Sequence, residues 1–108
     1  MTREGRRSQN EVWFRALNER LEARALDRGS AGATFEIVCE CALEECTERI
    51  GVTASEYERV RESGTHFILV PGHGDDTLEH VVELHGDYEV VEKIGAAAVV
   101  AESQDPRA

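Results

Sequence analysis

The first third of the chain carries apolar residues at helical spacing. Between residues 13 and 25 they recur every three or four positions, which is typical of one face of an amphipathic helix. Ser8 to Glu11 matches a capping box before this stretch, and Gly29 suits a left-handed stop after it. We therefore expect a long helix from residue 8 whose apolar stripe faces the core: Trp13, Phe14, Ala16, Leu17, Leu21 and Ala25.

Beyond residue 30 the pattern changes to short segments rich in β-branched and aromatic residues. Residues 34–39 alternate like a half-buried strand, and residues 66–70 are almost continuously apolar, which indicates a central strand. Residues 81–84 and 88–94 flank a His-Gly-Asp turn and predict a β-hairpin. Residues 96–101 fit either a strand or a helix, so the pattern leaves that segment open.

A second capping box predicts a short helix in the middle of the chain. Thr53 and Glu56 stand three positions apart, as this motif requires. Tyr57 and Val60 would then face the core, and Gly64 would mark the end of the helix. Together these elements predict an α+β fold, in which a long N-terminal helix and a short second helix pack on one small, mainly antiparallel sheet.

The chain has 108 residues, which is room for a single domain. We expect this domain to span residues 8–103, with flexible tails at residues 1–7 and 104–108. No apolar run approaches the roughly 18 residues that a membrane span needs. The basic residues at the start are not followed by a hydrophobic segment either. These features predict a cytoplasmic protein without membrane contact.

The charge of the chain is strongly negative and unevenly distributed. There are 12 Lys and Arg residues against 22 Asp and Glu, for a net charge of −10. Residues 1–30 hold seven Arg and five acids, whereas residues 31–108 hold five basic and 17 acidic residues. The acidic body repels a phosphate backbone, which argues against nucleic acid as a partner. A basic protein partner or self-association fits this distribution, and so does a basic helix that docks on its own body or stays solvated.

All three cysteines lie within eight residues, at positions 39, 41 and 46. Structural zinc takes four ligands, so three thiolates leave one position for a ligand from elsewhere in the fold. His73 is the best candidate, because it sits between two glycines on a turn after the apolar segment 66–70. We therefore predict one structural zinc ion held by Cys39, Cys41, Cys46 and His73, on a metal-binding loop that joins the first strand to the second helix.

Two other interpretations of the cysteines stay open. The thiols can pack as small buried apolar groups, or two of them can form a disulfide in a thiol redox switch. Nearby acids would raise the thiol pKa values and slow thiolate chemistry, whereas the same acids would favour a bound cation. These acids are Glu36, Glu40, Glu44, Glu45 and Glu48.

Several short motifs follow one another in a characteristic order. They are Asn10-Glu11, Phe14-Arg15, Asn18-Glu19-Arg20, Phe35 with Cys39-Glu40-Cys41, Cys46-Thr47-Glu48-Arg49-Ile50, Glu56 to Arg61, Pro71-Gly72-His73 and Val90 to Lys93. This order resembles that of a family of small actinobacterial proteins, over about residues 10–105. The resemblance implies a Cys3His metal site at the same four residues and implies no established activity. Ala42-Leu43 departs from the Gly-rich turn expected after the second cysteine.

Enzyme chemistry has little support in the sequence. Lys93 is the only lysine and no phosphate-binding loop accompanies it, and the stretch around His73 lacks the serine or second histidine of a hydrolase. The other histidine and acid pairs fit solvated strand residues better than a second metal site: His80 and His85 with Glu79 and Glu83. We therefore predict a non-enzymatic, zinc-stabilised domain for protein interaction or regulation, with a zinc-coupled thiol redox sensor as the alternative.

Overall fold

The computed structural model describes residues 3–29, 32–41, 43 and 45–107. The α+β fold class is confirmed, although the strands form two small antiparallel sheets, β1–β2 and β3–β5–β4, where one sheet was expected. The elements in chain order are α1 (Arg3–Asp27), β1 (Thr34–Val38), β2 (Arg49–Thr53), α2 (Ala54–Val60), β3 (His66–Leu69), β4 (Glu79–Leu84), β5 (Glu89–Lys93) and α3 (Gly95–Ser103).

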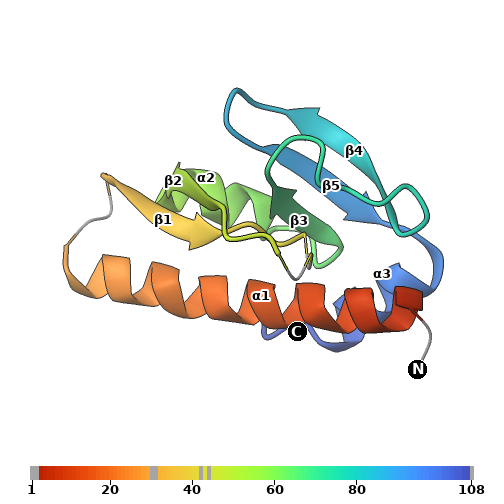
Figure 1. Ribbon diagram of the computed structural model, residues 1–108. Coiled ribbons are helices and arrows are strands. Elements are labelled where there is room, and N and C mark those ends of the chain that lie inside the picture. The colour runs from red at the N-terminus through yellow and green to blue at the C-terminus, as the bar shows by residue number, and fades with distance from the viewer. Residues whose placement is uncertain (1–2, 30–31, 42, 44, 108) are drawn as a thin grey trace.

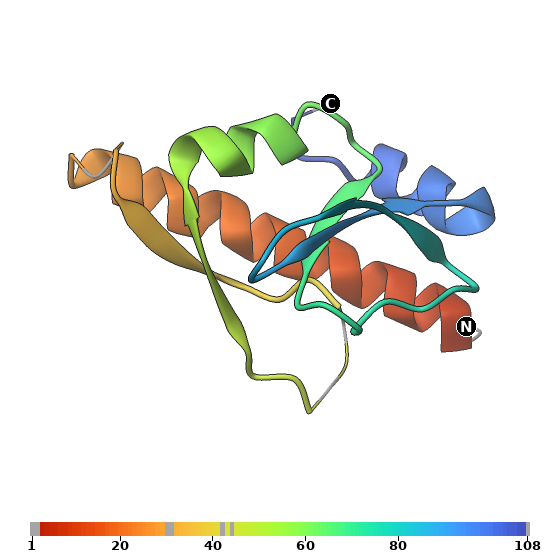
Figure 2. The same ribbon diagram turned by 90° about the horizontal axis from the view of Figure 1, so that it is seen from above.

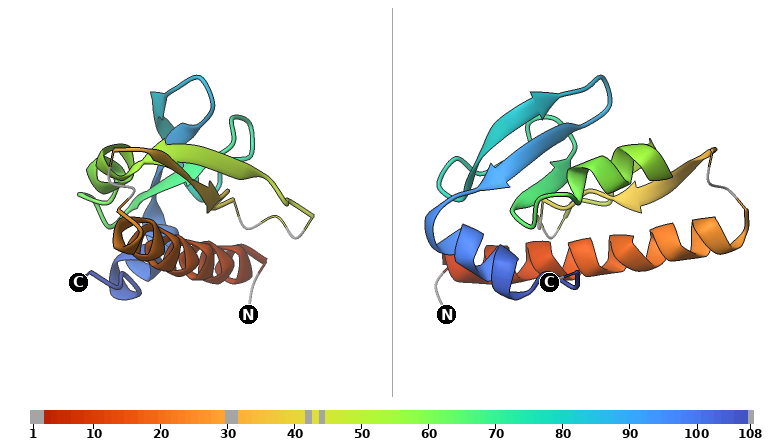
Figure 3. Two further views of the ribbon diagram at one scale, coloured as in Figure 1. Left: turned by 90° about the vertical axis from the view of Figure 1, so that its left-hand side faces the viewer. Right: turned by 180° about the vertical axis from the view of Figure 1, so that it is seen from behind.

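Helix α1 spans the length of the molecule beneath both sheets (Figure 1). Helix α3 lies beside the N-terminal half of α1, and α2 packs against β2 and β3 (Figure 2). The hairpin of β4 and β5 projects away from α1 (Figure 3). The apolar core lies between these layers and includes Ile37, Ile50, Val52, Tyr57, Phe67, Leu69 and Val91. No helix in the described part of the chain is long and apolar enough to cross a membrane.

The sheet order differs from the expected one. Strand β5 is central in the larger sheet and β3 is an edge strand, because the hairpin that was predicted from residues 81–94 places β5 next to β3. Strand β2 was missed, since its Gly51 weakens the strand pattern. Residues 96–101, which fitted either a strand or a helix, are helical, in agreement with their alanine content.

The capping box at the start of α2 is confirmed. Thr53 Oγ1 accepts a hydrogen bond from Glu56 N at 3.1 Å, and Glu56 Oε1 accepts one from Thr53 N at 2.8 Å. Tyr57 and Val60 are buried, as predicted. The helix ends at Val60, before the predicted stop at Gly64.

Helix α1 starts earlier than predicted and ends as predicted. It begins at Arg3, so Ser8 lies inside the helix and is not its N-cap. The contact of Arg7 with Asp75 stabilises this extra turn, and such tertiary contacts extend helices beyond their local signals. Gly29 has a φ of +74° just after the last turn, which is the left-handed stop expected there.

The predicted core face of α1 is wrong. Trp13 and Leu17 are 65% and 39% exposed. The face that packs on the body is mainly polar and consists of Ser8, Glu11, Val12, Arg15, Asn18 and Glu22. This face is polar because α1 packs on backbone groups of other segments, and these groups need hydrogen-bond partners. Arg15, for example, donates hydrogen bonds to the carbonyl oxygens of Gly64 and Ala101 at 2.6 and 2.7 Å.

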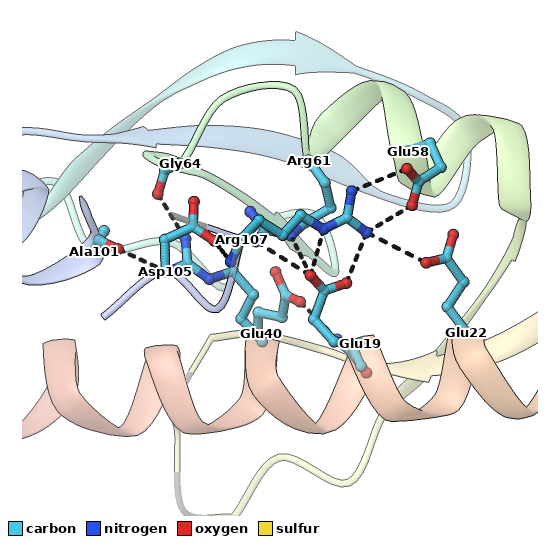
Figure 4. Close-up of polar contacts among 11 residues, drawn as sticks. Glu19, Glu22, Glu40, Glu58, Arg61, Gly64, Ala101, Asp105 and Arg107 are labelled. Carbon is cyan, nitrogen blue, oxygen red and sulfur yellow. Dashed lines mark hydrogen bonds and ion pairs between the residues drawn. The ribbon is translucent and has the colours of Figure 1, made fainter. Parts of the chain in front are cut away.

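Two arginines fasten the C-terminal end to the helices. Arg107 lies between Glu19 and Glu58, with nitrogen to oxygen distances of 2.5 and 2.6 Å (Figure 4). Arg61 binds Asp105 at 2.5 Å and Glu19 at 3.3 Å. Contacts therefore reach into both segments that were predicted to be tails, whereas the domain boundaries themselves stay a prediction.

Candidate metal centre

The connection between β1 and β2 meets the turn that follows β3 (Figure 2). One potential ligand atom from each of Cys39, Cys41, Cys46 and His73 lies within 4.8 Å of all the others. His73 Nδ1 is 3.7 Å from Cys39 Sγ and 3.5 Å from Cys46 Sγ. The four side chains that were predicted to meet therefore form one cluster that could hold a metal ion.

The C-x-C segment is held between the two sheets. Cys39 follows β1 directly, and its N–H donates to the Glu48 carbonyl at 3.2 Å. The next N–H, that of Glu40, donates to the Ile68 carbonyl of β3 at 3.0 Å. These two hydrogen bonds point to different sheets. The backbone of the segment is thus fixed whether or not the thiols bind anything.

The side chain of Glu40 points away from the sulfur atoms. Its carboxylate accepts hydrogen bonds from Ile68 N at 2.9 Å and from Asn18 Nδ2 at 2.7 Å. Burial raises the pKa of Glu40 above its usual range. This carboxyl group therefore braces the segment against α1 and β3 and does not face a cation beside the thiols.

His73 is positioned by a tight turn. Its N–H donates to the Val70 carbonyl at 3.1 Å, with Pro71 and Gly72 at the central positions. Gly72 has a φ of +87°, the left-handed value that a type II turn requires at this place. Glycine reaches this value without strain, whereas other residues rarely do. The local sequence thus explains why the imidazole is presented at the end of β3.

A single arginine joins the two segments of the cluster. Arg7 of α1 donates to the Cys41 carbonyl at 3.0 Å, and it forms an ion pair with Asp75 at 2.6 Å. Asp75 lies two residues after His73, so the guanidinium group holds both segments in place. Arg7 lies in the segment that was predicted to be a flexible tail, and no local motif marks it for this role.

The cluster is closed on one side and partly open on the other. Cys39 and Cys41 are buried, whereas Cys46 and His73 are partly exposed. A cavity of about 200 Å³ adjoins the exposed side. It is lined by Phe14, Leu17, Val38, Cys39, Cys46, Thr47, Glu48 and Arg49.

The thiols differ in how easily they ionise. A hydrogen bond from Cys39 lowers the pKa of Cys41 to about 5, and the same interaction raises the pKa of Cys39. Burial raises the pKa of Cys46. The expectation that nearby acids would raise the thiol pKa is therefore wrong for Cys41, where the hydrogen bond from Cys39 has the largest effect on the pKa. Ala42, expected to alter the turn after Cys41, and Glu44, expected to be one of the nearby acids, lie outside the described residues.

The spacing of the donor atoms suits zinc. With Zn–S bonds of about 2.3 Å and Zn–N bonds of about 2.0–2.1 Å, a tetrahedral site places sulfur and nitrogen ligands about 3.6 Å apart. The two sulfur to nitrogen distances at His73 are 3.7 and 3.5 Å. In addition, Val70 N donates to Cys39 Sγ at 3.2 Å, a contact that favours the charged thiolate. The arrangement could therefore hold a metal ion, and its sulfur and nitrogen donors are those that soft or borderline ions prefer.

A second buried cluster, which the sequence patterns did not predict, lies between α1 and the larger sheet. Lys93 lies between Glu11 of α1 and Glu79 of β4, and all three side chains are buried. The expectation that Glu79 is solvated is therefore wrong.

The docked face of α1 had a signal in the sequence. Polar residues at 8, 11, 15, 18 and 22 recur at helical spacing, and these residues are the ones that are buried.

Comparison of the chain with protein-family models, with curated proteins and with solved structures gives no match. The resemblance to an actinobacterial family stays a prediction. The function is inferred from the chemistry of the site and the surface of the molecule.

Proposed function

We propose that Cys39, Cys41, Cys46 and His73 hold one structural zinc ion in a small protein that binds or regulates another macromolecule. The observation that carries the metal proposal is the agreement between the sulfur to nitrogen distances and those of a tetrahedral zinc site. Thiolate and imidazole ligands together suit zinc better than magnesium or calcium, which prefer oxygen.

The ligand set favours a structural role over a catalytic one. Catalytic zinc keeps one coordination position for water or substrate, whereas four protein ligands fill a tetrahedral shell. Three ligands come from the β1–β2 connection and the fourth comes from the turn after β3. A bound ion would thus connect the two sheets at this edge, where Arg7 also joins the two segments.

The proposed partner is a basic protein. Residues 31–108 carry 17 acidic and five basic residues, and a surface of this charge attracts cationic partners. Self-association is the other arrangement that the charge distribution supports. The protein's location in the cytoplasm also belongs to this proposal.

Elemental analysis tests the metal directly. Protein purified without chelators should contain one zinc per chain, and the Cys41→Ser variant should contain much less. His85→Gln is the matched control, because His85 pairs with Glu83 and stacks on Tyr88 away from the cluster. A wild-type chain without stoichiometric metal would reject the proposal and return the thiols to the packing or redox interpretations.

One observation supports a redox sensor as a second candidate. Cys46 is partly exposed and its sulfur lies within 4.8 Å of the other two. Hydrogen peroxide could oxidise two thiols to a disulfide, with two electrons and two protons passing to the peroxide to give two molecules of water. A sensor should release zinc at low peroxide concentration, whereas a structural site should release it slowly.

A further inference from the structure

A row of three polar side chains crosses the larger sheet. Strand pairing places Glu92 of β5 between His66 of β3 and His80 of β4. His66 Nε2 lies 3.1 Å from one Glu92 oxygen, and His80 Nε2 lies 3.5 Å from the other. One carboxylate is therefore flanked by two imidazoles that come from the strands on either side.

The row lies on the solvent side of the sheet. The side chains of His66, Glu92 and His80 are 22%, 41% and 57% exposed. Their neighbours Phe67 and Val91 point the other way and are buried. Exposed side chains change rotamer within nanoseconds, so His80 and Glu92 can turn toward an ion beside the partly buried His66 without a change in the backbone.

The donor chemistry of the row is that of a transition-metal site. An ionised carboxylate only accepts hydrogen bonds, so an imidazole nitrogen that donates to Glu92 must give up that proton before it can bind a metal ion. A metal ion that replaces these protons would gain two nitrogen ligands and one oxygen ligand. Such a set suits Zn²⁺, Cu²⁺ and similar ions, and it leaves coordination positions for water. Glu83 lies toward the other end of β4, where Arg59 and His85 pair with it.

We propose that His66, His80 and Glu92 form a second site for a divalent transition-metal ion, separate from the cysteine cluster and in exchange with solution. Binding there is weaker than at the cysteine cluster, because the ligands are exposed and the two nitrogens now face different oxygens of one carboxylate. None of the three residues belongs to the cysteine cluster, so this site does not depend on the proposed structural zinc.

A zinc titration tests the site. Zn²⁺ is added to the full chain beyond one equivalent, while calorimetry records the binding and NMR records the imidazole C–H resonances. A second, weaker event should shift the resonances of His66 and His80. The double variant His66→Gln, His80→Gln should weaken this event at least about tenfold, because even the loss of a ligand's hydrogen-bond partner costs that much.

His85→Gln is the matched control, since its imidazole stacks on Tyr88 and the change leaves the row intact. Both binding events should persist in this variant. The site is rejected if wild-type protein binds no second zinc, if the second event survives the double variant, or if one ion binds per two chains. A weaker event in protein that elemental analysis shows to be free of tightly bound zinc would support this site while rejecting the structural zinc.

Discussion

Lys93 is a charged residue that is buried in the folded protein. Its ammonium group is buried between the carboxyl groups of Glu11 and Glu79. Burial raises the pKa of Glu11 to about 8, so near neutral pH this carboxyl group is mostly protonated. Glu79 is the second carboxyl group that contacts the Lys93 ammonium group.

Removal of the buried ammonium group should be costly. We predict that Lys93→Met lowers the free energy of unfolding by about 3–5 kcal/mol, because it leaves buried carboxyl groups without their cation. Urea denaturation followed by circular dichroism measures the change. Arg59→Ala is the control, since its ion pair with Glu83 is exposed and should contribute at most about 1 kcal/mol. Similar losses in both variants would contradict the importance of burial here.

The raised pKa of Glu11 makes the free energy of unfolding depend on pH in a predictable direction. The folded pKa of about 8 exceeds the unfolded value of 4.5, so the folded state binds the proton more tightly. The stabilising contribution of Glu11 is fully present below pH 4.5 and is lost as the pH rises through 8. Glu11→Gln removes this titration without a large change in shape.

The unfolding free energies of wild type and Glu11→Gln, measured by urea from pH 5 to pH 9, test this prediction. The wild type should become less stable relative to the variant as the pH rises. The comparison cancels groups that titrate alike in both proteins, the thiols included. A constant difference over this range would mean that Glu11 is ionised throughout.

At the scale of elements, α1 is docked by polar contacts. Asn18 donates to the Val38 carbonyl at 2.9 Å and accepts from Val38 N at 2.8 Å, while its amide also binds Glu40. We predict that Asn18→Ala costs about 2–4 kcal/mol, because it leaves buried groups unpaired. Leu17→Ala should cost about 1 kcal/mol or less, since Leu17 is 39% exposed.

Thermal and urea denaturation of both variants decide between the polar and the apolar face. Arg20→Ala, an exposed change on the same helix, serves as the control for lost helix contacts. If Leu17→Ala proved the more damaging change, the original apolar stripe would be the docking face after all.

Local signals predicted some elements and failed for others, for physical reasons. The capping box of α2 and the Val70 to His73 turn are decided within four residues, so the sequence was sufficient to predict them. The cysteine cluster was predictable because its three thiols are close in sequence. The docked face of α1 depends on backbone groups of Val38, Gly64 and Ala101, which are distant in sequence. The helical spacing of the buried polar residues marks this face, but no pattern within the helix identifies its distant backbone partners.

For the whole molecule, the proposed zinc ion is a link between two sheets. Its ligands must lose protons to bind, so metal binding is coupled to folding and is weakened by acid. We predict that a chelator lowers the melting temperature, and that Cys41→Ser does so without a chelator. His73→Ala should have a smaller effect, because water can take one position. A melting curve that a chelator leaves unchanged would contradict the link.

The charge of the whole molecule leads to a prediction about its partner. A basic protein captured by the acidic body should bind less as salt rises, since charges more than about 8 Å apart are screened at physiological ionic strength. Pull-down at low and high salt with the full chain measures this. Capture that is insensitive to salt would indicate an apolar interface instead, such as the surface around the exposed Trp13.

Because Lys93 is buried, the chemical reactivity of its amine can report when α1 separates from the larger sheet. It is the only lysine, and its amine lies between α1 and the larger sheet. An acylating reagent needs an accessible, unprotonated amine, so the native protein should protect this side chain while an opened molecule exposes it. The rate of acylation at Lys93 should then measure how often the helix leaves the sheet. A protease that cuts after lysine would record the same event as a single cleavage between residues 93 and 94.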